Sequence, residues 1–378
     1  MTVKTEVFRA EVVGSMVRPP QLVKARQQMR AGQLPAADYK AIEDEAVDEA
    51  LGIQEDAGMD VVTDGEMRRD VFFDFAVTGM EGAAMVGGNA FRFHGDTPEA
   101  AMEVQVPFSI TQKVKARRCP GVAEFEYAQA KTDLPVKIAI PSPTILMATY
   151  WNAEHSSEAY PDPVALGHDA DAVVRSWIAE LIDAGCKYIQ IDAPPTAGYY
   201  ADRSALEISA DGLRMDPDDL RELDLKLVTE LGDIGRPSDV TLAIHLCKGN
   251  GTQAWIAEGG YEMLAESGGL AKMSGYDAVH FEFDDDRSGG FEPLAALPEN
   301  VVAILGLVST KWTKLEDPAE LEQRIRAAAE FHPLDQLALA PQCGFASASE
   351  TAQERKIAPQ TQDEKLKLVA DVAKKVWG

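Results

Sequence analysis

The stretch AIHLCKGN, residues 243–250, places a histidine and a cysteine one residue apart at the end of a short apolar run. The chain contains only 6 His and 4 Cys, so the pairing of His245 with Cys247 is unusual. Side chains at positions i and i+2 of a β-strand point to the same face of the sheet. These two side chains could therefore bind one metal ion, and the motif alone leaves coincidence as the alternative.

The composition limits the classes of partner. The formal net charge of −26 argues against nucleic acid and against an anionic membrane surface. No apolar run reaches the roughly 18–20 residues that span a bilayer, and residues 1–16 lack the apolar core of a signal peptide. The four cysteines are scattered, unlike those of a secreted disulfide scaffold. We therefore expect a cytoplasmic protein that acts on small molecules, with no nucleic-acid or membrane partner.

Short, nearly continuous apolar runs recur along the chain, as expected for parallel strands that are buried on both faces. Eight such runs are found, at residues 8–14, 59–64, 136–141, 187–192, 240–246, 277–283, 301–307 and 336–341. Helix-like segments lie between most of them, and Gly185 ends the segment before the fourth strand. Eight alternating units predict an α/β fold of the (β/α)8 TIM barrel type. An open doubly wound sheet is the alternative, but no G-x-G-x-x-G follows any strand.

One segment interrupts this alternation. Residues 70–135 lie between the second and third strands and are too long for an ordinary loop. They contain Gly-rich turns and the alternating sequence MEVQVPFSI. We therefore predict a single barrel domain over residues 1–378, with an inserted β-rich excursion at residues 70–135 that covers one end of the barrel.

Chemistry in such a barrel takes place at the carboxyl ends of the strands. His245 and Cys247 end the fifth strand, Glu282 ends the sixth, and Cys343 follows the eighth. Two thiolates, an imidazole and a carboxylate form a donor set that suits zinc. The sequence thus predicts a Zn²⁺ site with these four ligands. Cys119 and Cys186 lie outside the strand ends and are interpreted as structural.

A zinc site with two sulfur donors indicates thiol chemistry. A free thiol has a pKa near about 8.5, and coordination to zinc delivers the thiolate at neutral pH. Of the four predicted ligands, the carboxylate of Glu282 is the weakest donor for a soft site and the candidate to loosen when a substrate sulfur arrives. The reaction class is alkylation of a small thiol at sulfur.

At this point the motifs resemble those of a known family. HLC, the Glu after the next strand and PQCG after the last are similar to the catalytic half of cobalamin-independent methionine synthase, and VVGSMVRPP, VVTDGEMRRD, PSPTIL, YIQID and LGLVSTK follow in order. The resemblance implies a barrel with one zinc bound by His245, Cys247, Glu282 and Cys343. It also implies that Ser15, Glu66 and Asp192 bind the amino acid part of homocysteine.

Several positions depart from the family pattern. Ala148 stands where the family has a Trp that stacks on the pterin. Val308 stands where the family has a His that serves as an acid during methyl transfer. The sequence DAPP at 192–195 replaces the family's DEP. These changes argue against methyltetrahydrofolate as the donor. We therefore expect transfer of a methyl or other alkyl group to a thiol such as homocysteine from a donor other than folate. A methylated carrier protein is one such donor.

Single-barrel relatives suggest a second reaction, the opening of an epoxide by coenzyme M in epoxyalkane:coenzyme M transferase. That reaction requires a cation for the sulfonate and an acid for the developing alkoxide. Tyr199 or Tyr200 could supply the acid. The cation candidates are Arg18, Arg68, Arg69, Lys248 and Lys311.

Two further alternatives belong to other classes. One is a non-catalytic barrel that binds zinc or a thiol, and the other is a decarboxylase that resembles uroporphyrinogen decarboxylase. A closed metal site would favour the first, and the decarboxylase would not require the His/Cys/Glu/Cys set. A homo-oligomer is compatible with the sequence, which does not name the thiol or the donor.

Overall fold

The computed structural model describes residues 7–95, 101–251, 254–347 and 357–378. Six parallel strands form the central sheet, in the order β12-β11-β10-β7-β6-β5. Their bounds are β5 (Lys137–Pro141), β6 (Tyr188–Asp192), β7 (Thr241–Leu246), β10 (Ala278–Glu282), β11 (Val302–Val308) and β12 (Leu337–Pro341). These strands match the last six predicted runs to within one residue at every end.

The first two predicted runs close the sheet into a barrel. Ala10 forms a parallel bridge with Leu339 of β12, and Val62 forms one with Val136 just before β5. The amide of Asp60 donates to the carbonyl of Ala10 at 3.0 Å, which joins the two segments to each other. The predicted TIM barrel is therefore confirmed, with eight parallel segments around its axis.

Residues 8–14 and 59–64 are nevertheless not regular strands, and this corrects the sequence prediction. The Asp60 carboxylate accepts hydrogen bonds from the amides of Arg9 and Ala10 at 2.6 and 2.9 Å. The hydroxyl of Thr63 donates to the carbonyl of Gly14 at 2.8 Å. Side chains thus hydrogen-bond to backbone groups that would pair with a neighbouring strand in a regular sheet. These backbone groups are therefore satisfied without a regular ladder.

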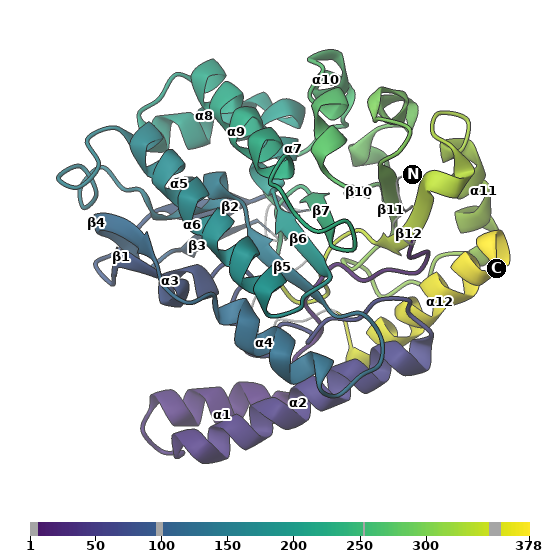
Figure 1. Ribbon diagram of the computed structural model, residues 1–378, viewed down its shortest axis with the longest axis horizontal. Helices are drawn as coiled ribbons and strands as arrows, with labels where there is room; N and C mark the ends of the chain where they lie inside the picture. The colour runs from purple at the N-terminus through teal and green to yellow at the C-terminus, as the bar shows by residue number, and fades with distance from the viewer. Residues whose placement is uncertain (1–6, 96–100, 252–253, 348–356) are drawn as a thin grey trace.

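Helices surround the sheet on its outer side, and α2 and α12 lie side by side along one flank (Figure 1). Three helices begin at an Asp-Pro pair, because the Asp side chain accepts a hydrogen bond from the first turn and Pro suits the first helical position. The long helices are α1 (Pro20–Arg30), α2 (Ala36–Ala57), α6 (Pro163–Asp183), α9 (Pro217–Gly232), α11 (Pro318–Ala328) and α12 (Pro359–Trp377). The other helices between β5 and β10 are α5 (Pro143–Tyr150), α7 (Pro194–Ala201), α8 (Arg203–Leu213) and α10 (Glu262–Glu266).

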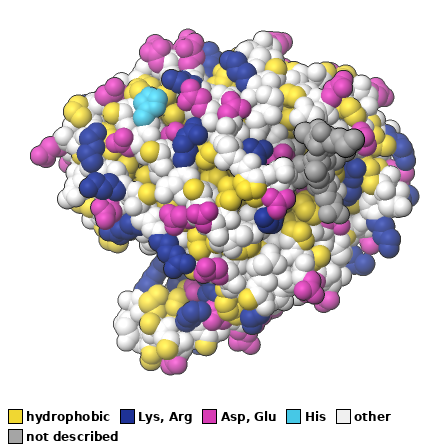
Figure 2. Space-filling model, viewed as in Figure 1, with side chains coloured by type: hydrophobic (Ala, Val, Ile, Leu, Met, Phe, Trp, Pro, Cys, Tyr) yellow, Lys and Arg dark blue, Asp and Glu magenta, His cyan; other side chains and the backbone are white. Residues whose placement is uncertain are grey.

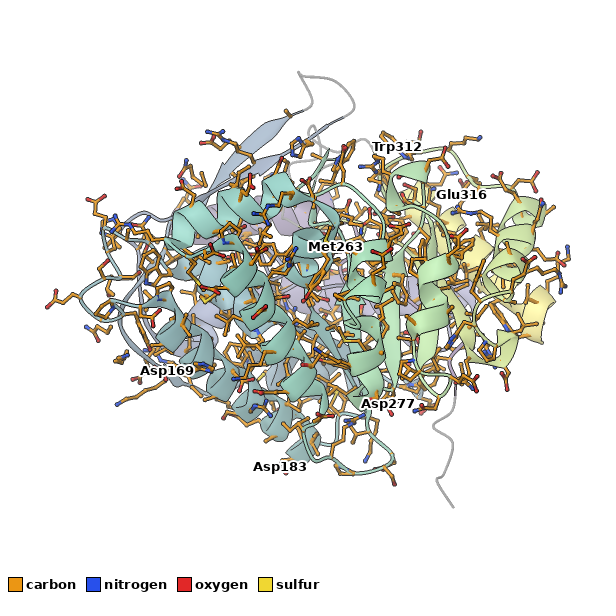
Figure 3. The ribbon with its side chains drawn as sticks, turned by 90° about the horizontal axis from the view of Figure 1, so that it is seen from above. Asp169, Asp183, Met263, Asp277, Trp312 and Glu316 are labelled. Carbon is orange, nitrogen blue, oxygen red and sulfur yellow. The ribbon has the colours of Figure 1, made fainter. Side chains whose placement is uncertain are left out.

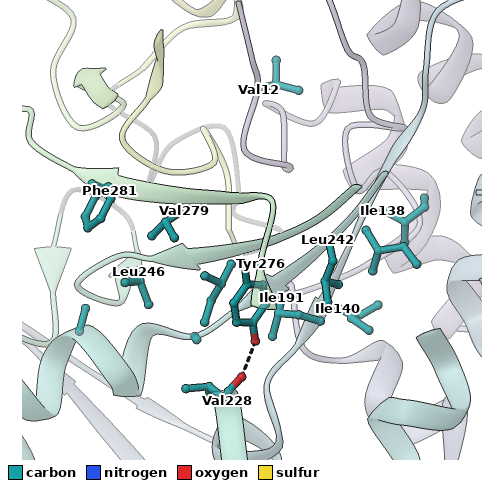
Figure 4. Packing of buried hydrophobic residues seen from close by; sticks show 14 of the residues in the cluster. Val12, Ile138, Ile140, Ile191, Val228, Leu242, Leu246, Tyr276, Val279 and Phe281 are labelled. Carbon is teal, nitrogen blue, oxygen red and sulfur yellow. Dashed lines mark hydrogen bonds between the residues drawn. The ribbon is translucent and has the colours of Figure 1, made fainter. Parts of the chain in front are cut away.

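The alternation of side chains along each strand creates two apolar layers. Outward residues pack against the helices, and the Tyr276 hydroxyl in this layer donates to the carbonyl of Val228 at 2.6 Å (Figure 4). Inward residues form a smaller cluster of Val61, Tyr188, Ala243, Ala278, Ile304, Ala338 and Ala340. The same alternation places Asp192, His245 and Glu282 on the inward face at the carboxyl ends of β6, β7 and β10.

The segment 70–135 contains two antiparallel pairs of strands, β1 with β4 and β2 with β3. Its elements are α3 (Phe75–Gly79), β1 (Met80–Ala84), β2 (Ala90–Phe93), β3 (Met102–Gln105), β4 (Ser109–Ala116) and α4 (Pro120–Gln129). In Figure 3 the pale blue β2–β3 pair projects at the end of the molecule where Trp312 follows β11, and Asp277, which precedes β10, lies at the opposite end. The β-rich excursion is thus found at the carboxyl end of the barrel. The assignment of residues 1–378 to one domain stays a prediction.

Acidic and basic side chains are interspersed on the face shown in Figure 2. Within the described ranges, none of the helices has the length and apolar character needed to span a membrane.

A buried polar network crosses the barrel interior near the amino ends of the strands. The Glu11 carboxylate lies 3.2 Å from Lys137 Nζ and 3.3 Å from His280 Nε2, and accepts a hydrogen bond from the Tyr188 hydroxyl at 2.7 Å. Burial raises the pKa of Glu11, but Lys137, His280 and Tyr188 together lower it below its ordinary value. The network therefore stabilises an ionised carboxylate inside the barrel.

We expect Lys137→Met to destabilise the protein by about 3–5 kcal/mol, because it leaves the Glu11 carboxylate buried without its cation. The double variant E11L/K137M should recover most of this loss. Urea unfolding followed by circular dichroism measures both. Lys187→Met is the matched control, since Lys187 pairs with Asp239 at the surface and its removal should leave the midpoint unchanged. A wild-type midpoint for Lys137→Met would contradict the network's role.

Candidate metal centre

The register of the sheet brings three chemically important strand ends together. Asp192 of β6 is aligned with His245 of β7, and His280 of β10 is aligned with His245 on the other side. Glu282 ends β10 two residues later, on the same face as His280. Because all these strands are parallel, their carboxyl ends meet at one edge of the barrel.

The structure gathers three of the four predicted ligands. One ligand atom each from His245, Cys247 and Cys343 lies within 4.8 Å of the other two. All three residues are buried, with 2%, 5% and 7% of their surface exposed. His245 and Cys247 come from the end of β7, whereas Cys343 follows β12, so the group joins segments that are almost 100 residues apart.

The donor set fits a metal ion such as zinc. Neither ring nitrogen of the buried His245 has a hydrogen-bond partner among the described residues. An unsatisfied imidazole of this kind is costly inside a protein unless a ligand binds it. Zinc–sulfur bonds of about 2.3 Å and zinc–nitrogen bonds of about 2.0 Å place tetrahedral donors about 3.5 Å apart, which small shifts of these side chains would reach.

The electrostatics of the group already favour an anionic sulfur. Contact with the Cys247 thiol and proximity to His245 lower the pKa of Cys343 well below its ordinary value, although burial opposes this. Burial would lower the pKa of His245, but Cys343, Asp192 and Glu282 raise it overall. Cys343 is therefore the sulfur that these surroundings favour as a thiolate, the form that binds metals.

Glu282 lies next to the group but is not part of it. Its Oε1 atom is 3.2 Å from Lys311 Nζ, and its Oε2 atom accepts hydrogen bonds from the amide of Lys248 at 2.9 Å and from Asn250 Nδ2 at 2.7 Å. Burial raises the pKa of Glu282, whereas Lys311, Lys248 and Asn250 together lower it. In this structure the carboxylate is ionised and directed to these partners.

A small cavity adjoins the three gathered ligands. Ser15, Glu66 and Asp192, three of the four residues predicted to bind a substrate, line it together with His245 and Cys343, whereas the fourth, Arg18, does not. Burial is the main cause that raises the pKa of Glu66, to about 7, and it also raises the pKa of Asp192. The cavity therefore contains carboxyl groups whose ionised form a bound cationic ligand would stabilise.

Arg18, Tyr199 and Tyr200 lie at three different places, and none of them lines the small cavity. The fully buried guanidinium of Arg18 donates to the carbonyls of Arg69, Ala346 and Glu66, and Arg18 does not line the small cavity. Tyr199 lines a second, apolar cavity beside the first. Tyr200 instead lines a surface groove on the other side of α7.

Three of the other four candidate cations have carboxylate partners. The exception is Lys248, whose Nζ atom has no hydrogen-bond partner among the described residues and lies 3.8 Å from the centre of the Tyr261 ring. Arg68 pairs with Glu43 and Asp44 at 2.7 and 2.6 Å, and Arg69 pairs with Glu124 at 2.6 Å. Lys311 pairs with Glu282, as described above. Each of these interactions places the cation beside an anion of the protein itself.

Sequence reasoning missed three residues of this site. Asn250, Phe72 and Ser347 line the small cavity, and Asn250 also holds Glu282. The position of Asn250 in the strand-end segment HLCKGN could have indicated it. Phe72 and Ser347 belong to loops that only the fold brings together.

Comparison with known proteins identifies the family. The sequence model for the catalytic domain of cobalamin-independent synthases matches residues 8–364. The chain belongs to this family. Two uncharacterized proteins of Bacillus subtilis (strain 168) are similar over nearly their full length, YxjG with 34% identity over 99% of this chain and 96% of its own, and YxjH with 33% identity over 98% and 95%.

Named relatives agree with this family assignment. A methionine synthase of Saccharolobus solfataricus is 24% identical over 90% of this chain and 89% of its own. The solved B12-independent methionine synthase from Shewanella sp. W3-18-1 has a TM-score of 0.75 and 18% identity, and covers 98% of each chain. The structural likeness supports the barrel fold of the cobalamin-independent synthase family.

Replacement of either gathered cysteine tests the metal centre. Cys247→Ser or Cys343→Ser should lower the bound zinc from about one equivalent to less than about a fifth, because serine is a poor donor for a soft site. Metal analysis of dialysed protein measures this. Cys186→Ser is the matched control, since Cys186 is fully buried near Val136 and Tyr188, away from the centre. Full zinc occupancy in either ligand variant would refute that ligand.

Proposed function

We propose that this protein transfers an alkyl group, such as a methyl group, to the sulfur of a small thiol of the homocysteine type. We assign His245, Cys247 and Cys343 as lasting ligands of one Zn²⁺ and Glu282 as an exchangeable fourth ligand. The observation that carries this proposal is the buried His/Cys/Cys group beside a cavity that holds Ser15, Glu66 and Asp192. The name methionine synthase, carried by a relative, agrees with it.

The bound metal would supply one chemical effect, a lowered thiol pKa that makes the sulfur nucleophilic at neutral pH. The residues of the chain then determine which thiol enters. Glu66 and Asp192 are carboxyl groups with raised pKa values in the cavity wall, and an ammonium group nearby would favour their ionised forms. Ser15 adds a hydroxyl to the same wall. An amino acid thiol matches this arrangement.

The same charges argue against coenzyme M. A sulfonate in the small cavity would meet the carboxyl groups of Glu66 and Asp192, and no Lys or Arg occurs among the described residues that line it. Arg68, Arg69 and Lys311 are paired with carboxylates, and Lys248 lines the adjoining cavity instead. The epoxide-opening reaction with this thiol is therefore the weaker candidate. A non-catalytic zinc barrel is also weaker, since the cavity leaves space beside the ligands for a substrate.

In the proposed reaction the thiol sulfur attacks a saturated carbon of the donor. A sulfur–carbon bond forms and the bond from that carbon to the leaving group breaks. The leaving group departs with the electron pair and takes up one proton, which balances the proton lost by the thiol. Tyr199 is better placed than Tyr200 to give that proton, because Tyr199 lines the adjoining cavity and Tyr200 does not.

The compartment and assembly also belong to this proposal. All four cysteines are free thiols, as expected in a reducing cytoplasm. A homo-oligomer and a carrier-protein donor stay predictions.

Zinc-edge X-ray absorption tests the function directly. Homocysteine added to the zinc-loaded protein should add one sulfur to the metal shell, and coenzyme M should not. A shell that neither thiol changes would contradict the proposal. A shell changed by coenzyme M alone would favour epoxide opening. Asp192→Asn should weaken the effect of homocysteine by about tenfold, since it removes one charge that would bind the ammonium group.

Lys311 is a positioning residue for the exchangeable ligand. Its Nζ atom is 3.2 Å from Glu282 Oε1 and 3.0 Å from Asp284 Oδ2, and Lys311 is 1% exposed. It therefore offers the Glu282 carboxylate a charged partner away from the three gathered donors. This second position leaves room for the thiol sulfur.

We expect Lys311→Met to raise the KM for the thiol about 10–100-fold while zinc content stays unchanged, because Glu282 then competes for the fourth position. X-ray absorption should show an added oxygen donor in the free variant. Lys365→Met is the matched control, because Lys365 is a buried lysine that pairs with Glu316 instead. An unchanged thiol KM in Lys311→Met, or an equal rise in both variants, would exclude this role.

A further inference from the structure

An apolar cavity of about 160 Å³ lies beside the metal centre. It shares Phe72, Pro194, Gly249, Asn250 and Ser347 with the small cavity that is lined by His245, Cys247 and Cys343. The two cavities therefore meet at the carboxyl end of the barrel. A molecule in the apolar cavity would lie next to a thiol in the small one.

The walls of this cavity are mainly hydrocarbon. No Asp or Glu occurs among its described lining residues. Lys248 is the one charged residue among them, and its Nζ atom lies 3.8 Å from the centre of the ring of Tyr261, which is not part of the lining. The apolar side chains of the lining include Phe72, Phe91, Phe93, Ala148 and Ile256. A lining of this kind favours uncharged ligands, because a buried charge without a partner is costly.

The insertion at 70–135 supplies one wall, and backbone contacts hold it in place. The side chain of Asn89, just before β2, donates to the carbonyls of Ala148 and Trp151 at 3.1 and 2.6 Å. His94, just after β2, exchanges backbone hydrogen bonds with Trp255 of β9 (Ala254–Trp255) at 2.6 and 3.0 Å. These two anchors at either end of β2 fix the positions of Phe91 and Phe93 between them.

Phe93 also packs against the loop that follows the ligand strand. A Cβ atom added to Gly251, in β8 (Asn250–Gly251), would lie 3.2 Å from the Phe93 ring, so the ring touches the backbone there. The lack of a side chain at Gly251 permits this approach. The phenyl ring thereby closes the cavity at the segment that begins with His245 and Cys247.

We propose that this cavity binds the alkyl donor, and that the donor is a small uncharged molecule with a hydrocarbon body. The donor assignment rests on the proposed thiol alkylation, whereas the apolar binding site does not. The volume is close to the roughly 150 Å³ of an engineered cavity that binds benzene, and well below the approximate 300–1,000 Å³ of pockets for drug-sized ligands. A pterin with an anionic glutamate tail matches neither this volume nor this lining.

Binding of toluene to the zinc-loaded full-length protein tests the site. Titration calorimetry should detect toluene, and Phe93→Ser should weaken its binding at least about tenfold. Arg92→Ser is the matched control, because Arg92 is the neighbouring residue of β2 and its side chain is exposed. Undetectable toluene binding by the wild type, or equal losses in both variants, would overturn the site.

A second variant covers the case in which Phe93→Ser fails to fold. Ala148→Trp adds a large side chain from α5 into the cavity and should abolish toluene binding while circular dichroism and zinc content stay unchanged. Retention of toluene affinity by a folded Ala148→Trp variant would also overturn the site.

The donor assignment requires that both substrates bind together. Saturating homocysteine should change the dissociation constant of toluene by less than about twofold, and methyltetrahydrofolate should not compete with toluene. Mutually exclusive binding of toluene and homocysteine would overturn the donor assignment, as would competition by the folate. If toluene binds but no thiol alters the zinc shell, the proposed function fails and the donor assignment fails with it. If homocysteine alters the shell but toluene does not bind, the function stands and the cavity proposal fails.

Discussion

The parallel register of β6, β7 and β10 is the constraint on which the site depends. Asp192 and His280 are both aligned with His245, and Glu282 and Cys247 extend the same edge by two residues. A shift of one residue in β7 would turn its imidazole toward the helices. The two bridges that bring residues 10 and 62 into the barrel close the ring and keep Cys343, after β12, opposite β7.

Charge compensation divides the barrel interior into two polar regions. Near the amino ends, Glu11 and Lys137 form a network with Tyr188 and His280 in which the carboxylate and the ammonium group are paired. Burial, followed by the positive charge of Lys137, lowers the pKa of His280 to about 3, so that the ring stays neutral near physiological pH. At the carboxyl ends the polar groups are incompletely satisfied, as the two unpaired nitrogens of His245 show. The first region stabilises the fold, and the second is left available for a ligand.

The insertion helps to form the apolar cavity in which we propose that the donor binds. Its strand β2 lines this cavity with the phenyl rings of Phe91 and Phe93, and the helix α5 presents the small side chain of Ala148 to the same space. These two features act together, since Asn89 of the insertion bonds to the end of α5. The thiol alkylation proposed for the metal centre and the donor binding proposed for the apolar cavity thus both depend on residues at the carboxyl end of the barrel.

The sequence by itself was enough to predict the barrel and to name the candidate metal donors. Parallel strands buried on both faces leave continuous apolar runs, and residues at the ends of such runs, such as His245 and Cys343, can be recognised by type and position. The structure alone showed that residues 8–14 and 59–64 are joined by single bridges, because the side chains of Asp60 and Thr63 take backbone partners across the chain. It also placed the Glu282 carboxylate beside Lys311 and built the apolar cavity from loops far apart in sequence. Such features depend on side-chain directions and distant packing, which no local pattern of residues encodes.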